Sequence, residues 1–180
     1  CSTTTNVVVL NAPSPIITLA ADTILCFGGT STITAMLVSG ASVPIAYNMN
    51  GGAYQASPIF TNNSFGTYTL GVKDSNNCTT TQLITIAQPA LLVINSATNT
   101  IPTCSPGADA AITINASGGS GVYAYSLNGG LAQTANIITG LSAGLYNIIV
   151  SDANNCSASA NTTITVPNSP MITSSIASNE

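Results

Sequence analysis

The chain has 180 residues, of which only 3% are charged, whereas about a quarter of the residues in an ordinary soluble domain carry charge. It has no histidine, one lysine or arginine and a formal net charge of −4, which leaves most acid–base catalysis short of residues and excludes the basic surface that nucleic-acid binding requires. The mean hydropathy of +0.43 is high, but no apolar run approaches the roughly 18 residues of a membrane-spanning helix.

The first residues of the chain repeat a pattern that returns later. Cys1 is followed by a Ser/Thr-rich stretch, an apolar run that ends at Leu10, and Pro13. The same order of cysteine, Ser/Thr-rich strand and proline recurs from Cys78 and from Cys156. We therefore expect residues 1–12 to be the last strand of a preceding repeat and the chain to be a window from a longer array.

Two full repeats are predicted, over residues 13–88 and 89–166, and residues 167–180 are predicted to be the first strand of a following repeat. Cys26 and Cys104 are 78 residues apart, as are Cys78 and Cys156. Segments 26–78 and 104–156 align without a gap and share 21 identities in 53 positions.

Short strands and turns are predicted within each repeat. Ile112 and Ile114 alternate with polar residues, and Asn-Gly-Gly at 50–52 and 128–130 suits tight turns. Roughly seven strands in each repeat predict an all-β chain of tandem immunoglobulin-like β-sandwiches. The proline junctions lack flexible spacers, so we expect the array to be stiff.

The four repeated cysteines are predicted to form one disulfide in each repeat, Cys26 with Cys78 and Cys104 with Cys156. Each bond would close a 52-residue separation and contribute about 4 kcal/mol. Zinc is the competing interpretation, but the chain has neither histidine nor C-x-x-C spacing. Stable disulfides indicate an extracellular location.

Cys1 has two interpretations. Its spacing to Cys26 resembles that of Cys78 to Cys104, which makes it the cysteine of a preceding repeat. Alternatively, it is the acylated N-terminal cysteine of a surface lipoprotein, followed by a Ser/Thr-rich tether.

The sequence V-Y-A-Y-S-L-N-G-G at 122–130 and the segment from Ile138 to Cys156, which holds G-L-Y and ends D-A-N-N-C, resemble the SprB-type repeat of Bacteroidota cell-surface adhesins. The resemblance implies a long secreted tandem-repeat protein of gliding or biofilm-forming cells, exported by the type nine secretion system. It implies no catalytic residue. The first copy departs from the pattern, with Ile45 where Tyr123 stands.

No catalytic, cofactor-binding or metal site is predicted. The acidic residues are too far apart in sequence for a paired acid–base site. Asp74-x-Asn76 and Asp152-x-Asn154 could offer oxygen atoms to calcium, but too few carboxylates accompany them, so a role in capping turns is favoured.

Heavy glycosylation would explain how so uncharged a surface meets water, and the chain would then be a glycoprotein. Asp22-Thr23-Ile24 resembles a Bacteroidota O-glycosylation motif, and N-x-S/T sequons occur along the chain. The candidate sites are Thr23, Asn62, Asn115 and Asn161.

The leading functional hypothesis is a secreted, non-enzymatic structural or adhesive protein that forms a stalk or fibril on a bacterial surface. Its expected partners are itself, head to tail or as covalently continuous repeats, and covalent glycans or surface polysaccharide. The alternative is a glycan-binding module that uses an aromatic strand with Tyr123 and Tyr125. Ice binding by the threonine ranks at 3–5, 79–81 and 163–165 is a third hypothesis, although these ranks recur too sparsely for a continuous array.

Overall fold

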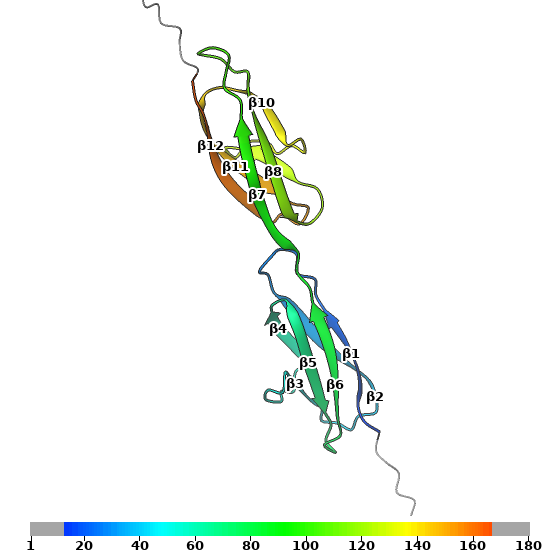
Figure 1. The fold of residues 1–180 in the computed structure, drawn as a ribbon. Coiled ribbons are helices and arrows are strands. Elements are labelled where there is room, and N and C mark those ends of the chain that lie inside the picture. The colour runs from blue at the N-terminus through cyan, green and yellow to red at the C-terminus, as the bar shows by residue number, and fades with distance from the viewer. Residues whose placement is uncertain (1–12, 167–180) are drawn as a thin grey trace, which may run out of the picture. The chain divides into compact units, whose positions relative to one another are not determined.

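The computed structural model describes residues 13–166, and these residues form twelve β-strands and no helix. The strands expected within 1–12 and 167–180, and Cys1, lie outside the described residues. The described chain divides into two compact units (Figure 1). Unit 1 contains residues 13–24 and Gly28–Gln88, and unit 2 contains Leu25–Phe27 and residues 89–166. The inclusion of Leu25–Phe27 in unit 2 is not anticipated by the sequence.

Unit 1 is built from two three-stranded antiparallel sheets. One has the order β1-β2-β4 and the other β3-β5-β6. Its strands are β1 (Ile16–Ala21), β2 (Ser31–Ser39), β3 (Ala46–Met49), β4 (Ile59–Asn63), β5 (Gly66–Lys73) and β6 (Thr79–Ile86).

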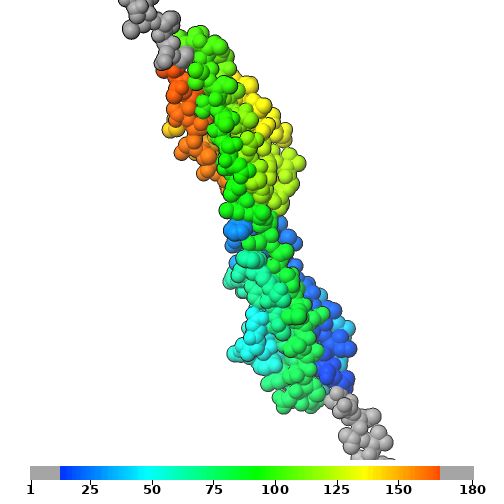
Figure 2. All heavy atoms as spheres, viewed as in Figure 1, coloured from blue at the N-terminus to red at the C-terminus, as the bar shows by residue number. Residues whose placement is uncertain are grey.

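Unit 2 repeats this topology strand for strand, with one sheet ordered β7-β8-β10 and the other β9-β11-β12. In the space-filling view its last strand lies beside its first, orange against green (Figure 2). Its strands are β7 (Ala90–Asn99), β8 (Ala110–Gly119), β9 (Ala124–Leu127), β10 (Ile137–Leu141), β11 (Gly144–Ser151) and β12 (Ser157–Ile164).

Each unit has one apolar core between its two sheets. In unit 1, Ile33 of one sheet packs in the same cluster as Leu70 and Val72 of the other. In unit 2, Ile112 takes part in a cluster with Ile148 and Val150. Ile33, Ile112, Ile148 and Val150 have more exposed neighbours along their strands because successive side chains of a strand point to opposite faces. The all-β, immunoglobulin-like sandwich class predicted from the sequence is confirmed.

Each unit has six strands rather than roughly seven. The stretch after the Asn-Gly-Gly turn forms only an isolated bridge, between Tyr47 and Gln55 in unit 1 and between Tyr125 and Gln133 in unit 2. The turns themselves are as predicted, since Asn50 and Asn128 both adopt a φ of 50°, a conformation that asparagine tolerates better than most residues.

The gapless alignment of the repeats is wrong by one residue in the strand that follows the first cysteine. It places Ile33 against Ala111, but the cross-strand register places Ile33 against Ile112, because these two pair with Phe60 and Ile138. A slip of one residue turns every side chain to the other face of the sheet. The loop after Cys104 is one residue longer than the loop after Cys26, and this extra residue places Ile112 in the core.

Candidate functional site

A tight loop between β11 and β12 is organised by the buried carboxylate of Asp152. Its Oδ1 accepts hydrogen bonds from the backbone N–H groups of Asn154 (2.9 Å) and Cys156 (2.9 Å), and its Oδ2 accepts one from Ser120 (2.8 Å). Asn155 adopts a φ of 63° within this loop. Burial acts to raise the pKa of Asp152, but the three backbone donors outweigh it and hold the pKa below its ordinary value.

Unit 1 presents the same loop between β5 and β6. Asp74 Oδ1 accepts from Asn76 N–H (2.9 Å) and Cys78 N–H (2.8 Å), its Oδ2 accepts from Ser42 N–H (3.2 Å), and Asn77 has a φ of 62°. Both aspartates therefore cap turns, the role favoured over calcium. Within residues 13–166 no three Asp, Glu, His or Cys side chains gather as metal ligands would.

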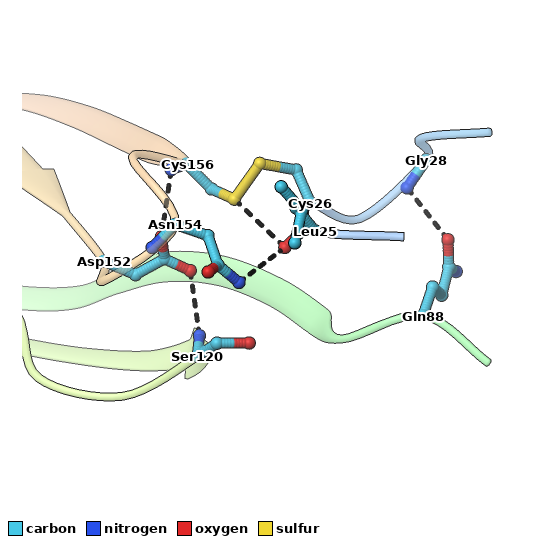
Figure 3. The surroundings of a disulfide bond; sticks show 8 residues. All are labelled: Leu25, Cys26, Gly28, Gln88, Ser120, Asp152, Asn154 and Cys156. Atoms are coloured by element: carbon cyan, nitrogen blue, oxygen red, sulfur yellow. Dashed lines mark hydrogen bonds between the residues drawn. A yellow bond between two sulfur atoms is a disulfide. The ribbon is translucent and has the colours of Figure 1, made fainter. Parts of the chain in front are cut away.

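The predicted disulfide pairing is wrong, because Cys26 is bonded to Cys156 (Figure 3). The reason is visible in unit 1, where Cys78 directly precedes β6 and Gly28 N–H donates to Gln88, just beyond the other end of β6. Eight residues of strand separate these ends by about 27 Å, whereas disulfide-bonded Cα atoms lie within about 7 Å.

The second predicted pair fails for the same reason in unit 2. Cys104 lines a hollow together with Val166, which follows β12, whereas Cys156 precedes β12. Among the described residues, Cys78 and Cys104 carry free thiols. Equal placement in two repeats correctly marked the four cysteines as related. It could not show that the two cysteines of one repeat lie at opposite ends of their sandwich.

The segment Leu25–Phe27 is held to the Asp152 loop by more than the disulfide. The Asn154 side-chain amide donates to the Leu25 carbonyl oxygen (3.1 Å), and Cys156 Sγ lies 3.4 Å from the same oxygen. A disulfide sulfur carries no proton, so the second approach is a contact and not a hydrogen bond. Phe27 lines a neighbouring hollow with Leu92. Figure 3 shows the Leu25 carbonyl directed at both partners.

The aromatic strand considered for glycan binding is used inside unit 2. Tyr125 is only 7% exposed, and Tyr123 O–H donates to the Gly118 carbonyl (2.7 Å). The two rings meet edge to face with centroids 6.4 Å apart. Tyr125 therefore presents no free face on which a sugar could stack.

A different aromatic side chain is accessible in unit 1. Tyr54 is 42% exposed, and Lys73 Nζ lies 4.6 Å from the centre of its ring. Both residues line a hollow of about 410 Å³. At the aligned positions unit 2 has Ala132 and Ser151, so this feature is not duplicated.

The candidate glycosylation residues are all exposed, but they are not equivalent. Thr23 precedes the buried Ile24 in the loop between β1 and β2. The side-chain nitrogen of Asn115 already donates to Ser96 Oγ (3.0 Å). Asn161 accepts from Asn147 through its oxygen, which leaves its nitrogen accessible. The structure thus offers Thr23, Asn62 and Asn161 more freely than Asn115.

Residues 96–132 match the SprB repeat family, so the chain carries a SprB-type repeat, as the sequence motifs indicated. The match covers the aromatic strand and the Asn-Gly-Gly turn of unit 2. No curated protein matches the chain. In residues 13–166, no helix has the length and apolar character needed to cross a membrane.

Three solved structures resemble the chain at low identity. A C-terminal 282-residue fragment of intimin, in complex with the intimin-binding domain of the translocated intimin receptor, is 17% identical, with a TM-score of 0.44 over 85% of this chain and 64% of that one. Protocadherin gamma B7 cadherin domains 1–4 are 16% identical (TM-score 0.34; 86% and 50% covered). The Bacteroides ovatus protein SGBP-B, in complex with a mixed-linkage heptasaccharide, is 17% identical (TM-score 0.28; 87% and 48% covered). The chain spans less than two thirds of each of these three chains.

Proposed function

We propose that this chain is part of an extracellular, non-enzymatic repeat protein whose sandwiches follow one another head to tail in a stalk or fibril on a bacterial surface. The observation that carries the proposal is the pairing of Cys26 with Cys156. This disulfide joins residues 130 apart, which is one 78-residue period plus the 52 residues from Cys26 to Cys78. It therefore ties one repeat period to the next.

The course of the backbone gives further support. The chain passes between the units after Ile24, after Phe27 and after Gln88. Ordinary domains joined by a linker need only one such passage. Three passages and a disulfide suit a stalk that must stay intact while it holds an adhesive surface away from a gliding or biofilm-forming cell. The use of Asp74 and Asp152 as turn caps is consistent with a role without catalysis.

Electron microscopy of negatively stained native material, purified from the producing cells, tests the proposal. We expect thin filaments or stalks with an axial repeat of one or two sandwich lengths. Isolated globular particles in the native material would contradict it.

We further propose that glycans cover part of this surface. Large apolar side chains are exposed beside few charges, among them Leu131 (99%) and Leu145 (67%). Intact-mass analysis and peptide mapping of the native protein should find added hexose-containing mass, with the peptide that holds Thr23 modified and the Asn115 peptide unmodified. A chain at its sequence mass would contradict this part of the proposal.

Carbohydrate recognition is a second candidate function, favoured by the accessible Tyr54 beside Lys73 above a hollow. Aromatic faces and a cation are groups that proteins use to hold polar ring-shaped ligands. Binding to a glycan array should be lost in Tyr54→Ala. It should be retained in Leu131→Ala, which removes an even more exposed apolar side chain from unit 2. Equal binding by both variants would exclude this site.

A further inference from the structure

Two cysteines of the described chain, Cys78 and Cys104, have no disulfide partner, although the cysteines one 78-residue period away from them do. Cys104 lies one period after Cys26, and Cys78 lies one period before Cys156. Cys26 and Cys156 are bonded to each other, whereas Cys78 and Cys104 are free thiols. The existing disulfide joins the first cysteine of one repeat to the second cysteine of the next. The two free thiols are likewise one first cysteine, Cys104, and one second cysteine, Cys78.

The loop that carries Cys78 already has the conformation of the loop that carries bonded Cys156. The Asp74 and Asp152 carboxylates each accept hydrogen bonds from three backbone N–H groups at equivalent positions, and the asparagine before each cysteine has nearly the same φ. The N–H of each aspartate also donates to the carbonyl of its cysteine, at 3.1 and 3.0 Å. The unit 1 loop is therefore formed without a disulfide and is ready to accept one.

One contact differs between the two loops, and it is the contact to the incoming segment. In unit 2 the Asn154 amide donates to the Leu25 carbonyl (3.1 Å). In unit 1 the equivalent Asn76 amide donates to the exposed Ser42 hydroxyl (2.9 Å). Ser42 therefore occupies the donor that an incoming carbonyl would use. Exchanging a solvent-exposed hydroxyl for such a carbonyl conserves the hydrogen bond.

The segment around Cys104 has the features of a segment that docks. Pro102 is buried at the position that corresponds to buried Ile24, so both cysteines follow two residues after an anchored side chain. Cys104 is exposed. Thr103 is fixed by Asp109, to which its N–H (3.0 Å) and its hydroxyl (2.6 Å) donate. Ser105 replaces Phe27, so this segment has less apolar surface and depends more on the covalent bond.

We propose that Cys104 of one copy of this chain forms a disulfide with Cys78 of a second copy, in the manner of Cys26 with Cys156. The second copy would then follow the first as unit 2 follows unit 1 in sequence. The two thiols lose two protons and two electrons as the S–S bond forms. A small disulfide such as oxidised glutathione accepts them and is reduced to two thiols. This inference rests on the proposed head-to-tail array and names its covalent junction.

The test uses the full chain with Cys1→Ser in every variant. The variants then differ only in the free thiols Cys78 and Cys104. One variant adds Cys78→Ser and the other adds Cys104→Ser, and each is incubated in a glutathione redox buffer alone and in an equimolar mixture. We expect a covalent dimer in the mixture and none in either variant alone, as seen by non-reducing electrophoresis. Peptide mapping should find Cys104 bonded to Cys78. Adding Asn76→Ala to the Cys104→Ser variant should reduce the yield of dimer.

Several results would overturn the inference. Dimers of each variant alone, as plentiful as in the mixture, would mean that the thiols react without selection. A mixture that stays monomeric, although thiol titration and a cooperative melt show folded protein with accessible thiols, would also contradict it. If native filaments are seen but contain no Cys104–Cys78 peptide, this inference fails and the array stands. If the peptide forms but the native material is not filamentous, the proposed function fails.

Discussion

Asp152 shows how a single carboxylate sets the conformation of a loop in an otherwise nearly uncharged protein. Its two oxygens accept three backbone hydrogen bonds, from Ser120, Asn154 and Cys156. Only the ionised form offers this many acceptor sites without a proton in the way. Loop geometry and the placement of the disulfide thus depend on one negative charge.

Stability should consequently depend on pH in the acid range. Because the pKa of Asp152 in the folded state is depressed below its ordinary value of 3.8, its contribution is fully present above that value and is lost as the pH falls through the lower folded value. Asp109, whose pKa the Thr103 hydroxyl and N–H lower, acts in the same direction. Calorimetry from neutral pH to about pH 2 should show a falling melting temperature at the acid end.

Asp152→Asn is the matched control for this measurement. The variant should melt at a lower temperature at neutral pH and show a shallower acid dependence, since one titrating group is gone. A wild-type melting temperature that rises on acidification would contradict the assignment.

At the scale of strands, the two units fill one cross-strand position, which alternates with the core residues along each strand, with different but complementary pairs. In unit 1, buried Asn48 of β3 lies opposite Gly71 of β5. A Cβ on Gly71 would lie 2.2 Å from the Asn48 side-chain oxygen. At the aligned place in unit 2, Ser126 lies opposite Ile149. In unit 1 the smaller residue of the pair, Gly71, is on β5. In unit 2 the smaller residue, Ser126, is on β9, which is the equivalent of β3.

Exchanging these pairs tests that complementarity. Gly71→Ile alone should destabilise unit 1 by about 1–3 kcal/mol, as overpacking does. The double variant Asn48→Ser with Gly71→Ile should recover part of this loss, because it reproduces the pair found in unit 2. Urea unfolding measures both. Strictly additive effects of the two substitutions would show that the residues do not share one space.

Strand content, turn positions and fold class were predictable because they depend on local signals. The alternation at Ile112 and Ile114 and the Asn-Gly-Gly turns can each be recognised from a few neighbouring residues. The disulfide partner of Cys26 was not predictable in this way, since it depends on which end of a sandwich each loop reaches. The one-residue slip after Cys104 escaped the alignment because identities on either side of it keep the 78-residue spacing.

At the scale of the whole chain, the Cys26–Cys156 bond should make a large contribution to stability. A disulfide between residues 130 apart limits the freedom of the unfolded chain by about 5 kcal/mol on the loop-entropy estimate. Reduction, or Cys26→Ser, should therefore lower the melting temperature markedly. Cys104→Ser is the control and should leave the melting temperature of the isolated chain unchanged. Equal melting temperatures before and after reduction would contradict this account.

The same bond decides how the chain would carry a pulling force. β1 precedes Cys26 and β12 follows Cys156, so tension applied at the two ends enters the bond and bypasses the 129 residues from Phe27 to Asn155. If they were fully extended, those residues would add about 430–460 Å to the length of the chain. Single-molecule stretching of the oxidised protein should release only the short segments outside the ring, and adding a reductant should release the hidden length. The disulfide would thus transmit the load directly, so that ten of the twelve strands in residues 13–166 bear none.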